Sequence, residues 1–557
     1  MTNTLPILFI IIVFTFSTPN HTVATEKYIQ KTVSSLDTLW ISPHVSTTHF
    51  YQNYNTLNKK FHNALTLKRF QHTSLPPTIQ HLFRKKLYQL SNPTPPQIEN
   101  LLSQYVIPKL KAIINSTENL KLRQQQLTEH DEKITFAQIK GKSTSLTQKQ
   151  LNTILNTTYI FVPYLSESHT KVNVPGKNGT KKAITTLTGG VFWYHVKYDS
   201  TKAVSIHLNQ QVHAETKYEI NVLTHLVDKT HSKKIIDNAI YASEKKAFNA
   251  LIDELALKTR QLPAFKLTDQ IVEANKNQYA IRIGKRENIK LDDTFYMYEW
   301  VINNNKKQAK RVGFGYITHV GNNIKKPDHK STFTQQLGDP QSIGGWIKED
   351  PRYKLSLRLS PFYQTGLSIK KDAFNLNRDG IQYQLLDKDY DSAVGIGANA
   401  LYNLAQYTNI SQLFSTITIR GSIPISSSQA STNSSSSTVS TSPLLYSGYV
   451  GLKKKFWKKN HSLAIRTAIG YDGIYLLASN DHFNNIDIRT LGTELEIGYE
   501  NLLSPNTSLF ITFTKKWTLS NAEFSYSYKG TNYSHSQSIN DFSLGGLMIS
   551  TGVELHF

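Results

Sequence analysis

The sequence predicts a multidomain chain in which an α-helical and α/β region precedes a C-terminal antiparallel transmembrane β-barrel. Three observations carry this prediction: an apolar run near the N-terminus, a middle region of mixed helical and strand patterns, and a series of alternating segments from Arg352 to the end. Each alternating segment is about ten residues long, which is the length of a tilted strand that crosses a bilayer. The series predicts about eight barrel strands, with ten as the alternative.

Length and composition limit the classes that remain. The chain has 557 residues, of which 39% are hydrophobic and 11% aromatic, so it is long enough for several folded domains. It contains no cysteine. This excludes disulfides, thiolate metal sites, a cysteine nucleophile and an acylated-cysteine lipid anchor. No other metal or cofactor motif is present, so no cofactor is predicted.

Residues 1–24 are interpreted as a secretory signal peptide. The segment Leu5–Phe16 is largely apolar, and Thr22-Val23-Ala24 offers a cleavage site of small residues. Residues 1–4 lack Lys and Arg, which departs from the usual signal pattern. A retained membrane helix is the alternative, but the run is shorter than the roughly 20 residues that span a bilayer.

Two soluble regions are predicted between the signal and the barrel. Residues 25–150 read as mainly helical, with a helical apolar spacing over 99–125 that Pro108 should kink or split. Residues 151–345 read as an α/β domain, in which strand patterns precede an amphipathic helix from Ile236 to Ala256. A small antiparallel β-module is expected at about 277–322.

Residues 346–557 carry the barrel. In the segment Ile417–Ile425, for example, isoleucines alternate with Thr418, Arg420 and Ser422. Eight such strands are predicted at 352–363, 392–404, 413–425, 444–457, 462–477, 487–500, 507–519 and 543–557. A soluble β-sandwich would alternate in the same way. The connections distinguish the two, because they alternate long and short in phase, as in transmembrane barrels with short periplasmic turns and longer external loops.

Aromatic residues fall near the predicted strand ends, where amphipathic rings favour the headgroup level of a membrane. Two girdles are therefore expected. The periplasmic girdle would contain Tyr353, Tyr402, Phe414, Trp457, Tyr499 and Phe557, and the outer girdle would contain Phe362, Tyr446, Tyr475 and Trp517.

The last strand ends on Phe557, with Ile549, Val553 and Leu555 on the same face. This pattern resembles the C-terminal assembly signal of bacterial outer-membrane β-barrel proteins, and the strand count is similar to that of the small OmpA-like barrels. The resemblance covers about 210 residues. It implies a location in the outer membrane of a Gram-negative bacterium, with residues 25–345 in the periplasm, and as partners the membrane lipid and the barrel-assembly machinery. The periplasmic region itself shows no known family.

Charged residues take the inward positions of several strands. These are Lys354, Arg358, Arg420, Arg466, Glu494, Glu496, Glu500 and Glu554. An eight-stranded barrel has an interior only wide enough for side chains, and buried charges are unfavourable unless they pair. The favoured interpretation is an ion-pair network that fills the lumen, and the alternative is a small gated pore.

No constellation of catalytic residues was found. Gly141-Lys142-Ser143 resembles the end of a phosphate loop, but the required earlier glycine is Phe136. The leading hypothesis is therefore a non-enzymatic outer-membrane protein that anchors a periplasmic domain in a structural or interaction role. A small transport channel is the alternative, and a membrane-bound hydrolase is a weaker one.

The charge is uneven along the chain. Residues 346–557 hold 19 Lys and Arg against 16 Asp and Glu, whereas residues 1–345 hold 44 against 24, a net of +20. This excess would suit an anionic envelope polymer or an acidic periplasmic protein, although a compositional bias of the genome would give the same excess. No nucleic-acid partner is expected.

Overall fold

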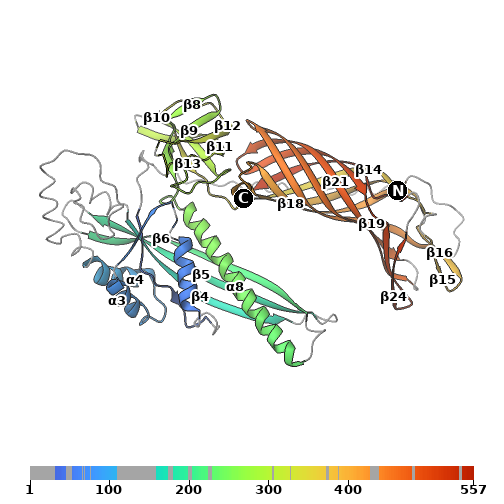
Figure 1. The fold of residues 1–557 in the computed structure, drawn as a ribbon, viewed down its shortest axis with the longest axis horizontal. Helices are drawn as coiled ribbons and strands as arrows, with labels where there is room; N and C mark the ends of the chain where they lie inside the picture. The colour runs from blue at the N-terminus through green and yellow to red at the C-terminus, as the bar shows by residue number, and fades with distance from the viewer. Residues whose placement is uncertain are drawn as a thin grey trace.

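The computed structural model shows three units in chain order: an N-terminal sheet with helices, a small β-module and a long barrel (Figure 1). It describes residues 32–45, 53–65, 67, 69–75, 77–108, 158–173, 180–198, 204–223, 229–303, 306–326, 328–371, 375–386, 388–426, 438–478, 483–537 and 542–557. The predicted signal peptide, the Gly141-Lys142-Ser143 segment and most of the predicted 99–125 helix lie outside these residues.

The N-terminal unit is built on one six-stranded sheet. Its main path runs β3–β1–β4–β5–β6, with β2 also paired to β4. The strands are β1 (Thr32–Ser35), β2 (Trp40–Ile41), β3 (Gln71–Ser74), β4 (Thr158–Asn173), β5 (Thr180–Tyr198) and β6 (Val204–Leu223). Because β1 pairs in parallel with β4, residues 25–150 do not form a separate, mainly helical domain. The predicted boundary at residue 150 is wrong, since this pairing crosses it.

Helices cover both faces of this sheet. The helices are α2 (Tyr54–Leu65), α3 (Pro77–Leu87), α4 (Pro95–Leu101), the π-helix η1 (Leu102–Val106) and the long α8 (Lys229–Gln261). Alternation along the strands sends Phe161 and Trp193 toward α2 and α8, whereas Ile160 and Tyr194 pack with α3 and α4. Where both faces are covered, β4 is buried at consecutive residues over 159–165 and β5 over 191–194, and these stretches read as nearly continuous apolar runs. None of the helices in the described part of the chain combines the length and apolarity needed to cross a membrane.

The β-module spans more of the chain than the predicted 277–322. Seven strands pair in the order β7–β13–β10–β11–β12–β9–β8. They are β7 (Thr268–Gln270), β8 (Glu273–Asn275), β9 (Gln278–Ile281), β10 (Thr294–Asn303), β11 (Lys306–His319), β12 (Ser331–Gly338) and β13 (Trp346–Glu349). The short β7, β8 and β13 lack a long alternating pattern, which explains the narrower prediction.

The N-terminal unit and the β-module share one apolar core. Phe265, directly after α8, packs against Trp193 of the sheet, with ring centroids 4.5 Å apart, and the same cluster continues to Phe295 and Phe333 of the module. The Arg69 guanidinium also pairs with the buried Glu349 carboxylate across the two units. The two units are therefore packed as one body.

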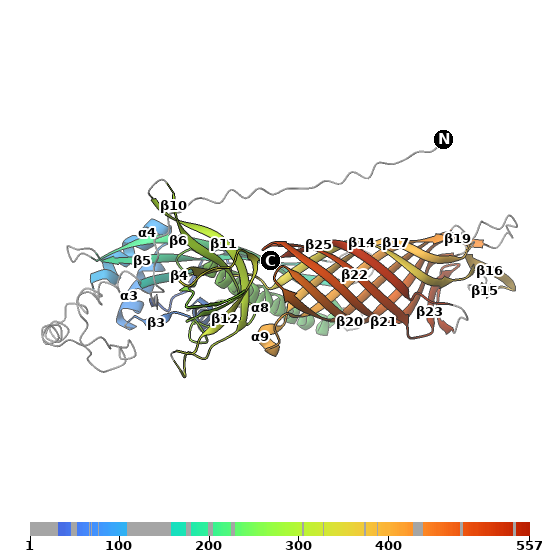
Figure 2. The same ribbon diagram turned by 90° about the horizontal axis from the view of Figure 1, so that it is seen from above.

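The barrel closes with eight antiparallel strands. They are β14 (Leu355–Ile369), β17 (Tyr390–Asn403), β18 (Leu413–Ser426), β19 (Thr438–Lys458), β20 (His461–Ala478), β21 (Phe483–Ser504), β22 (Thr507–Thr518) and β25 (Gly546–His556). Neighbouring strands pair in that order, and β14 pairs with β25 to close the ring. Figure 2 shows the tilted strands from a second side. The count is eight, as the alternation predicts, rather than ten.

The two ends of the barrel differ. At one end, called here the mouth, the connections are short: β19–β20 and β21–β22 each leave two residues between strands, and β17–β18 contains the one-turn helix α9 (Ala405–Thr408). At the other end, called here the cap, the strands run on and four more join them. These are β15 (Asn375–Arg378), β16 (Ile381–Leu386), β23 (Ala522–Tyr528) and β24 (Thr531–Gln537). The cap has its own core around Phe483, Leu385 and Phe524.

Candidate functional site in the barrel lumen and mouth

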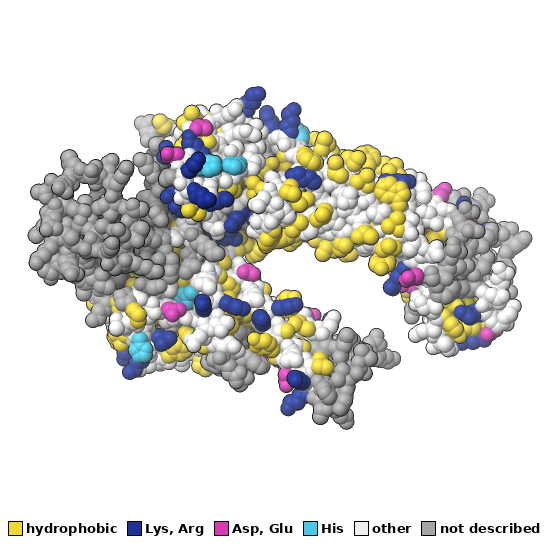
Figure 3. Space-filling model, in the orientation of Figure 1, with side chains coloured by type: hydrophobic (Ala, Val, Ile, Leu, Met, Phe, Trp, Pro, Cys, Tyr) yellow, Lys and Arg dark blue, Asp and Glu magenta, His cyan; other side chains and the backbone are white. Residues whose placement is uncertain are grey.

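The barrel exterior is apolar. Outward positions of the strands are large aliphatic residues that stay exposed, such as Ile396 at 74%, Ile419 at 63% and Leu463 at 60%. Figure 3 shows that hydrophobic side chains gather along the barrel wall. Inward neighbours such as Thr418 and Arg466 are buried. A sheet that exposes apolar side chains and leaves no open edge satisfies its backbone internally, which is what a bilayer requires.

Most of the predicted girdle residues lie at the barrel ends and outside the lumen. Tyr353, Tyr402 and Tyr499 lie at the mouth end, and Tyr499 accepts or donates a hydrogen bond with His461 Nδ1 at 2.6 Å. Tyr446, Tyr475 and Trp517 lie at the cap end. Trp517 and Tyr353 are 42% and 49% exposed.

Phe362, Phe414 and Trp457 are corrections to the girdle. Phe362 and Phe414 are each 7% exposed, and Phe414 and Trp457 line a cavity inside the mouth. The Lys455 ammonium lies 5.0 Å from the centroid of Phe414, and Trp457 Nε1 donates to Gln412 Oε1 at 2.9 Å. Each ring shares the parity of the lumen residues on its strand, so the alternation already assigns it to the interior.

The residues of the predicted assembly signal face outward. Ile549, Val553, Leu555 and Phe557 are 37–47% exposed. The first three share one face of β25, the strand that closes the ring against β14, and Phe557 directly follows it. The Phe557 amide donates to the Leu355 carbonyl oxygen at 2.9 Å.

The lumen is crossed by a connected set of ion pairs, called here the lumen network. Arg358 Nε lies 2.6 Å from Glu554 Oε2, and Arg358 also pairs with Glu500. Arg466 Nε lies 3.0 Å from Glu496 Oε2, and Arg466 also pairs with Glu494. Arg420 Nη1 completes the chain, 2.9 Å from the other oxygen of Glu494. All these side chains are 7% exposed or less.

Two further lysines belong to this network and were missed by the sequence analysis. Lys453 Nζ lies 2.9 Å from Glu496 Oε1, and Lys455 Nζ lies 2.7 Å from Glu500 Oε2 and 2.7 Å from Glu554 Oε1. Lys453 and Lys455 occupy alternate positions of β19, in phase with its other inward residues, and this alternation could have identified them. They stand within the run Lys453-Lys454-Lys455, which reads locally as a solvated turn.

A smaller cluster lies nearer the cap. Lys516 Nζ lies 2.6 Å from Asp472 Oδ1, and the Tyr449 hydroxyl donates to the other oxygen of Asp472. All three side chains are buried. Among the described lumen residues, these clusters give six cations and five carboxylates, and each carboxylate has a cation within 3.0 Å. The charge is thus largely neutralised within the barrel.

Lys354 does not belong to the lumen network. It has a left-handed φ of 62° at the start of β14, and its Nζ lies 2.9 Å from Asp293 Oδ1 of the β-module. The expectation that Lys354 points into the lumen is wrong, because the turn before the strand redirects its side chain to the module.

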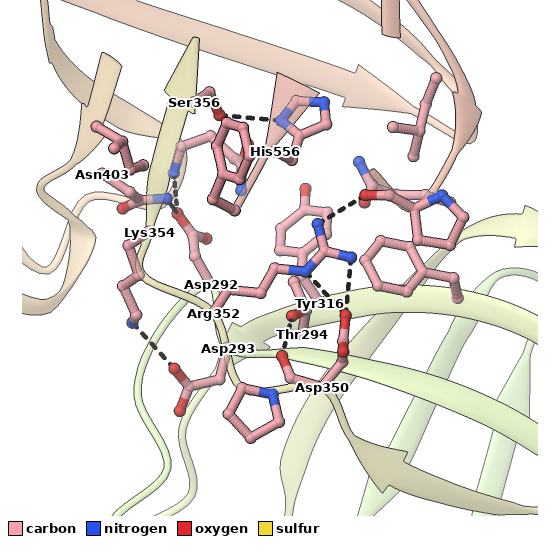
Figure 4. A pocket seen from close by; sticks show the side chains of 18 of the residues that line it. Asp292, Asp293, Thr294, Tyr316, Asp350, Arg352, Lys354, Ser356, Asn403 and His556 are labelled. Atoms are coloured by element: carbon pink, nitrogen blue, oxygen red, sulfur yellow. Dashed lines mark hydrogen bonds and ion pairs between the residues drawn. The ribbon is translucent and has the colours of Figure 1, made fainter. Parts of the chain in front are cut away.

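Asp292 joins the β-module to the barrel mouth. Its carboxylate accepts hydrogen bonds from Asn403 Nδ2 at 2.8 Å, from the Ser411 hydroxyl at 2.5 Å and from the Gln412 amide at 2.6 Å. Arg352 adds a contact, since its guanidinium donates to the Pro505 carbonyl oxygen at 2.6 Å. We call the contacts of Asp292 and Arg352, together with the Lys354–Asp293 pair, the latch (Figure 4). A cavity of about 100 Å³ lies beside it.

His556 bridges three neighbouring strands at this level. Its Nδ1 lies 2.9 Å from Ser356 Oγ of β14, and its Nε2 lies 2.8 Å from Ser508 Oγ of β22. Glu554 Oε1 is 3.4 Å from Nδ1, so the residue types of a hydrolase triad are present. However, Ser508 is fully buried and Glu554 is held by Arg358 and Lys455. A nucleophile needs an accessible Oγ, and Ser508 has none.

Ser356 also lines the cavity and is 5% exposed, with its Oγ engaged by His556. The described residues contain no group of three or more His, Asp and Glu side chains arranged to hold a metal ion.

The closed ring, the apolar exterior and the charged, filled interior define the class: the chain is an outer-membrane β-barrel protein. No protein-family model matches it, and no curated protein matches it. Among solved structures it is similar to Neisserial surface protein A, at 10% identity and a TM-score of 0.24, over 37% of this chain and all of that one. It is also similar to OprG from Pseudomonas aeruginosa, at 9% identity and a TM-score of 0.25, over 36% of this chain and 95% of that one.

A third similar structure is Ail, the attachment invasion locus protein of Yersinia pestis, at 10% identity and a TM-score of 0.20, over 36% of this chain and 98% of that one. At such identities and TM-scores, these likenesses carry no argument about function.

Proposed function

We propose that this protein is a non-enzymatic anchor, whose barrel holds the N-terminal unit and the β-module in the periplasm at the inner surface of the outer membrane. The observation that carries the proposal is the combination of a filled lumen with a mouth to which the β-module is fixed. A barrel of this kind serves to position what is attached to it.

The lumen network argues against the alternative of a small channel. Eight strands enclose a space that side chains fill, and here Arg358, Lys453, Lys455 and Arg466 occupy it with their carboxylate partners. Moving any one of them would leave a buried charge without its partner, which is unfavourable. An ion path through this interior would require several pairs to open together.

The latch supports the anchoring role. Asp292 receives donors from Asn403, the last residue of β17, and from Ser411 and Gln412 in the short connection that leads to β18. Arg352 reaches the connection between β21 and β22. Short connections face the periplasm in transmembrane barrels. The β-module would therefore lie directly beneath the membrane, and the N-terminal unit would follow it through their shared core.

The net positive charge of the anchored region suggests anionic partners. Residues 1–345 carry a net of +20, and a basic surface attracts anionic polymers of the envelope or an acidic periplasmic protein. The barrel itself would contact outer-membrane lipid and would be inserted by the barrel-assembly machinery through β25.

Two measurements test the anchor. Purified protein in planar bilayers should give no stable conductance steps, and regular steps would favour the channel instead. In intact cells, protease should cleave the serine-rich segment 426–443 and leave residues 25–345 protected. Cleavage within 25–345 under those conditions would show that this region lies outside the cell, and it would contradict the proposed anchor.

A further inference from the structure

The N-terminal unit ends in a long projection, called here the arm, formed by the far ends of β4, β5 and β6 with the first half of α8. In both views the far end of α8 lies at the level of the barrel wall and not behind the mouth (Figure 1 and Figure 2). The space-filling view shows an open gap between the arm and the barrel (Figure 3). The arm therefore approaches the region that lipid occupies around the barrel.

Contacts at the other end of α8 account for this placement. The Gln261 amide donates to the Pro351 carbonyl oxygen at 3.3 Å, just before β14. One turn or two earlier, Glu254 and Lys258 interact electrostatically with Tyr353, and Asp253 does so with Tyr402. The C-terminal part of α8 thus lies beside the girdle at the mouth. Its 33 residues extend about 50 Å at 1.5 Å per residue.

The far end of the arm is one packed structure. Ile235, Ile236 and Ile240 of α8 pack with Ala183 of β5 and Ile220 of β6 in a small apolar cluster. The strands are in register there, since Ala183 is opposite Ile220. The helix start and the strand ends therefore present their charges together.

The charged residues at the arm end are mostly lysines. The described segments of the arm end are 171–173, 180–184, 217–223 and 229–237. Their described side chains include five lysines, Lys171, Lys182, Lys217, Lys233 and Lys234, against two acidic residues, Glu219 and Asp237. Glu219 is already engaged, 2.9 Å from Lys217 Nζ and 3.7 Å from Lys182 Nζ. Lys233 and Lys234 are exposed on the first turns of α8. The arm end is thus a basic surface with isoleucines beneath it.

We propose that the arm end binds the anionic phospholipid headgroups of the periplasmic leaflet. Lysines cannot enter the hydrocarbon beside the barrel without a large cost, so the basic end of an arm directed toward this region is expected to stay in the headgroup layer. Basic segments near a membrane are attracted to anionic lipid over about one Debye length. The proposal rests on the proposed function, because it takes the mouth as the periplasmic end.

The test uses the absence of cysteine from the chain. A single Asn221→Cys substitution places a fluorophore on an exposed position of the arm end, opposite Lys182. The full-length protein is reconstituted in nanodiscs with headgroup-quencher lipid, in phosphatidylcholine alone or with about one third phosphatidylglycerol. We expect severalfold stronger quenching with phosphatidylglycerol, and its loss in 1 M salt because screening shortens the interaction.

A charge variant identifies the residues responsible. The triple variant Lys182→Gln, Lys233→Gln and Lys234→Gln should lower the lipid-dependent quenching at least severalfold. The matched control Lys285→Gln, Lys325→Gln and Lys326→Gln removes the same charge from exposed positions of the β-module and should leave the quenching unchanged.

Equal quenching in both lipids, or none in either, would overturn the inference, and so would equal losses in the two triple variants. The nanodisc measurement is independent of orientation in the cell. If residues 25–345 are protected in intact cells but no quenching is observed, only the arm proposal fails. If these residues are cleaved in intact cells, the anchor proposal fails whatever the quenching result.

Discussion

Glu496 lies at the centre of the lumen network, so its neutralisation is the sharpest test of the filled barrel. Lys453 Nζ is 2.9 Å from Oε1, Arg466 Nε is 3.0 Å from Oε2, and Arg358 Nη1 is 3.7 Å from Oε1. A Glu496→Gln substitution keeps the shape of the side chain. It removes the negative charge that these three cations share.

The expected cost follows from the burial of those cations. Lys453, Arg466 and Arg358 are each 3% exposed or less, so water cannot replace the lost carboxylate. Removing one partner of a buried ion pair costs about 3–5 kcal/mol. The remaining contacts of the cations, with Glu494, Glu500 and Glu554, keep the cost within that range, because no cation loses every partner.

Equilibrium unfolding of the full chain in urea, in lipid vesicles, measures this cost through tryptophan fluorescence and heat-dependent gel mobility. The matched control is Glu523→Gln, since Glu523 is exposed on β23 in the cap and surface changes of this kind stay within about 0.5 kcal/mol. A Glu496→Gln protein as stable as the Glu523→Gln protein would refute the view that paired charges fill the lumen.

Three further outcomes are expected. Gly552→Ala should weaken the β14–β25 closure by about 1–3 kcal/mol, because a Cβ there would clash with the Leu359 carbonyl oxygen; Gly421→Ala, with nothing within 4 Å of its Cβ, is the control in the same unfolding assay. Asp292→Asn, which tolerates the left-handed φ of 64°, should lose about 1.5–3 kcal/mol of charge-assisted hydrogen bonding at the latch. Limited proteolysis should then cut residues 346–354 faster, and an unchanged rate would argue against the latch. Removal of Phe557 should reduce the folded barrel in the outer membrane severalfold, seen as loss of its heat-modifiable band; an unchanged yield would contradict its role in assembly.

The barrel could be predicted from the sequence because its signal is local. Period-two alternation marks one strand at a time, and closure adds only the pairing of the first strand with the last. The predicted strand 444–457 is β19 over Thr438–Lys458 in the structure. The difference lies at the cap, where the strand continues through serines and threonines that carry no apolar alternation.

The N-terminal unit could not be predicted in this way because its sheet depends on distant pairing. β1 and β4 are hydrogen-bonded, although more than a hundred residues separate them, and neither strand end shows which partner it will take. The latch has the same character. Asp292 contacts Asn403 and Ser411 because the folded barrel mouth packs against the β-module. No residue spacing in the sequence predicts this contact.

The alternation identified the arginines and glutamates of the lumen but missed Lys453, Lys455, Lys516 and Asp472. The pairing of these charges follows from the size of the barrel. Eight strands leave no room for water-filled space, so a charged inward residue must meet an opposite charge from a neighbouring strand or from across the ring. Arg358 of β14 reaches Glu500 of β21 and Glu554 of β25, and Lys455 of β19 meets the same two carboxylates. Strands on opposite sides of the ring are thereby tied through the interior. A barrel so tied keeps its mouth in a fixed shape, and a fixed mouth is what the proposed anchoring of the β-module requires.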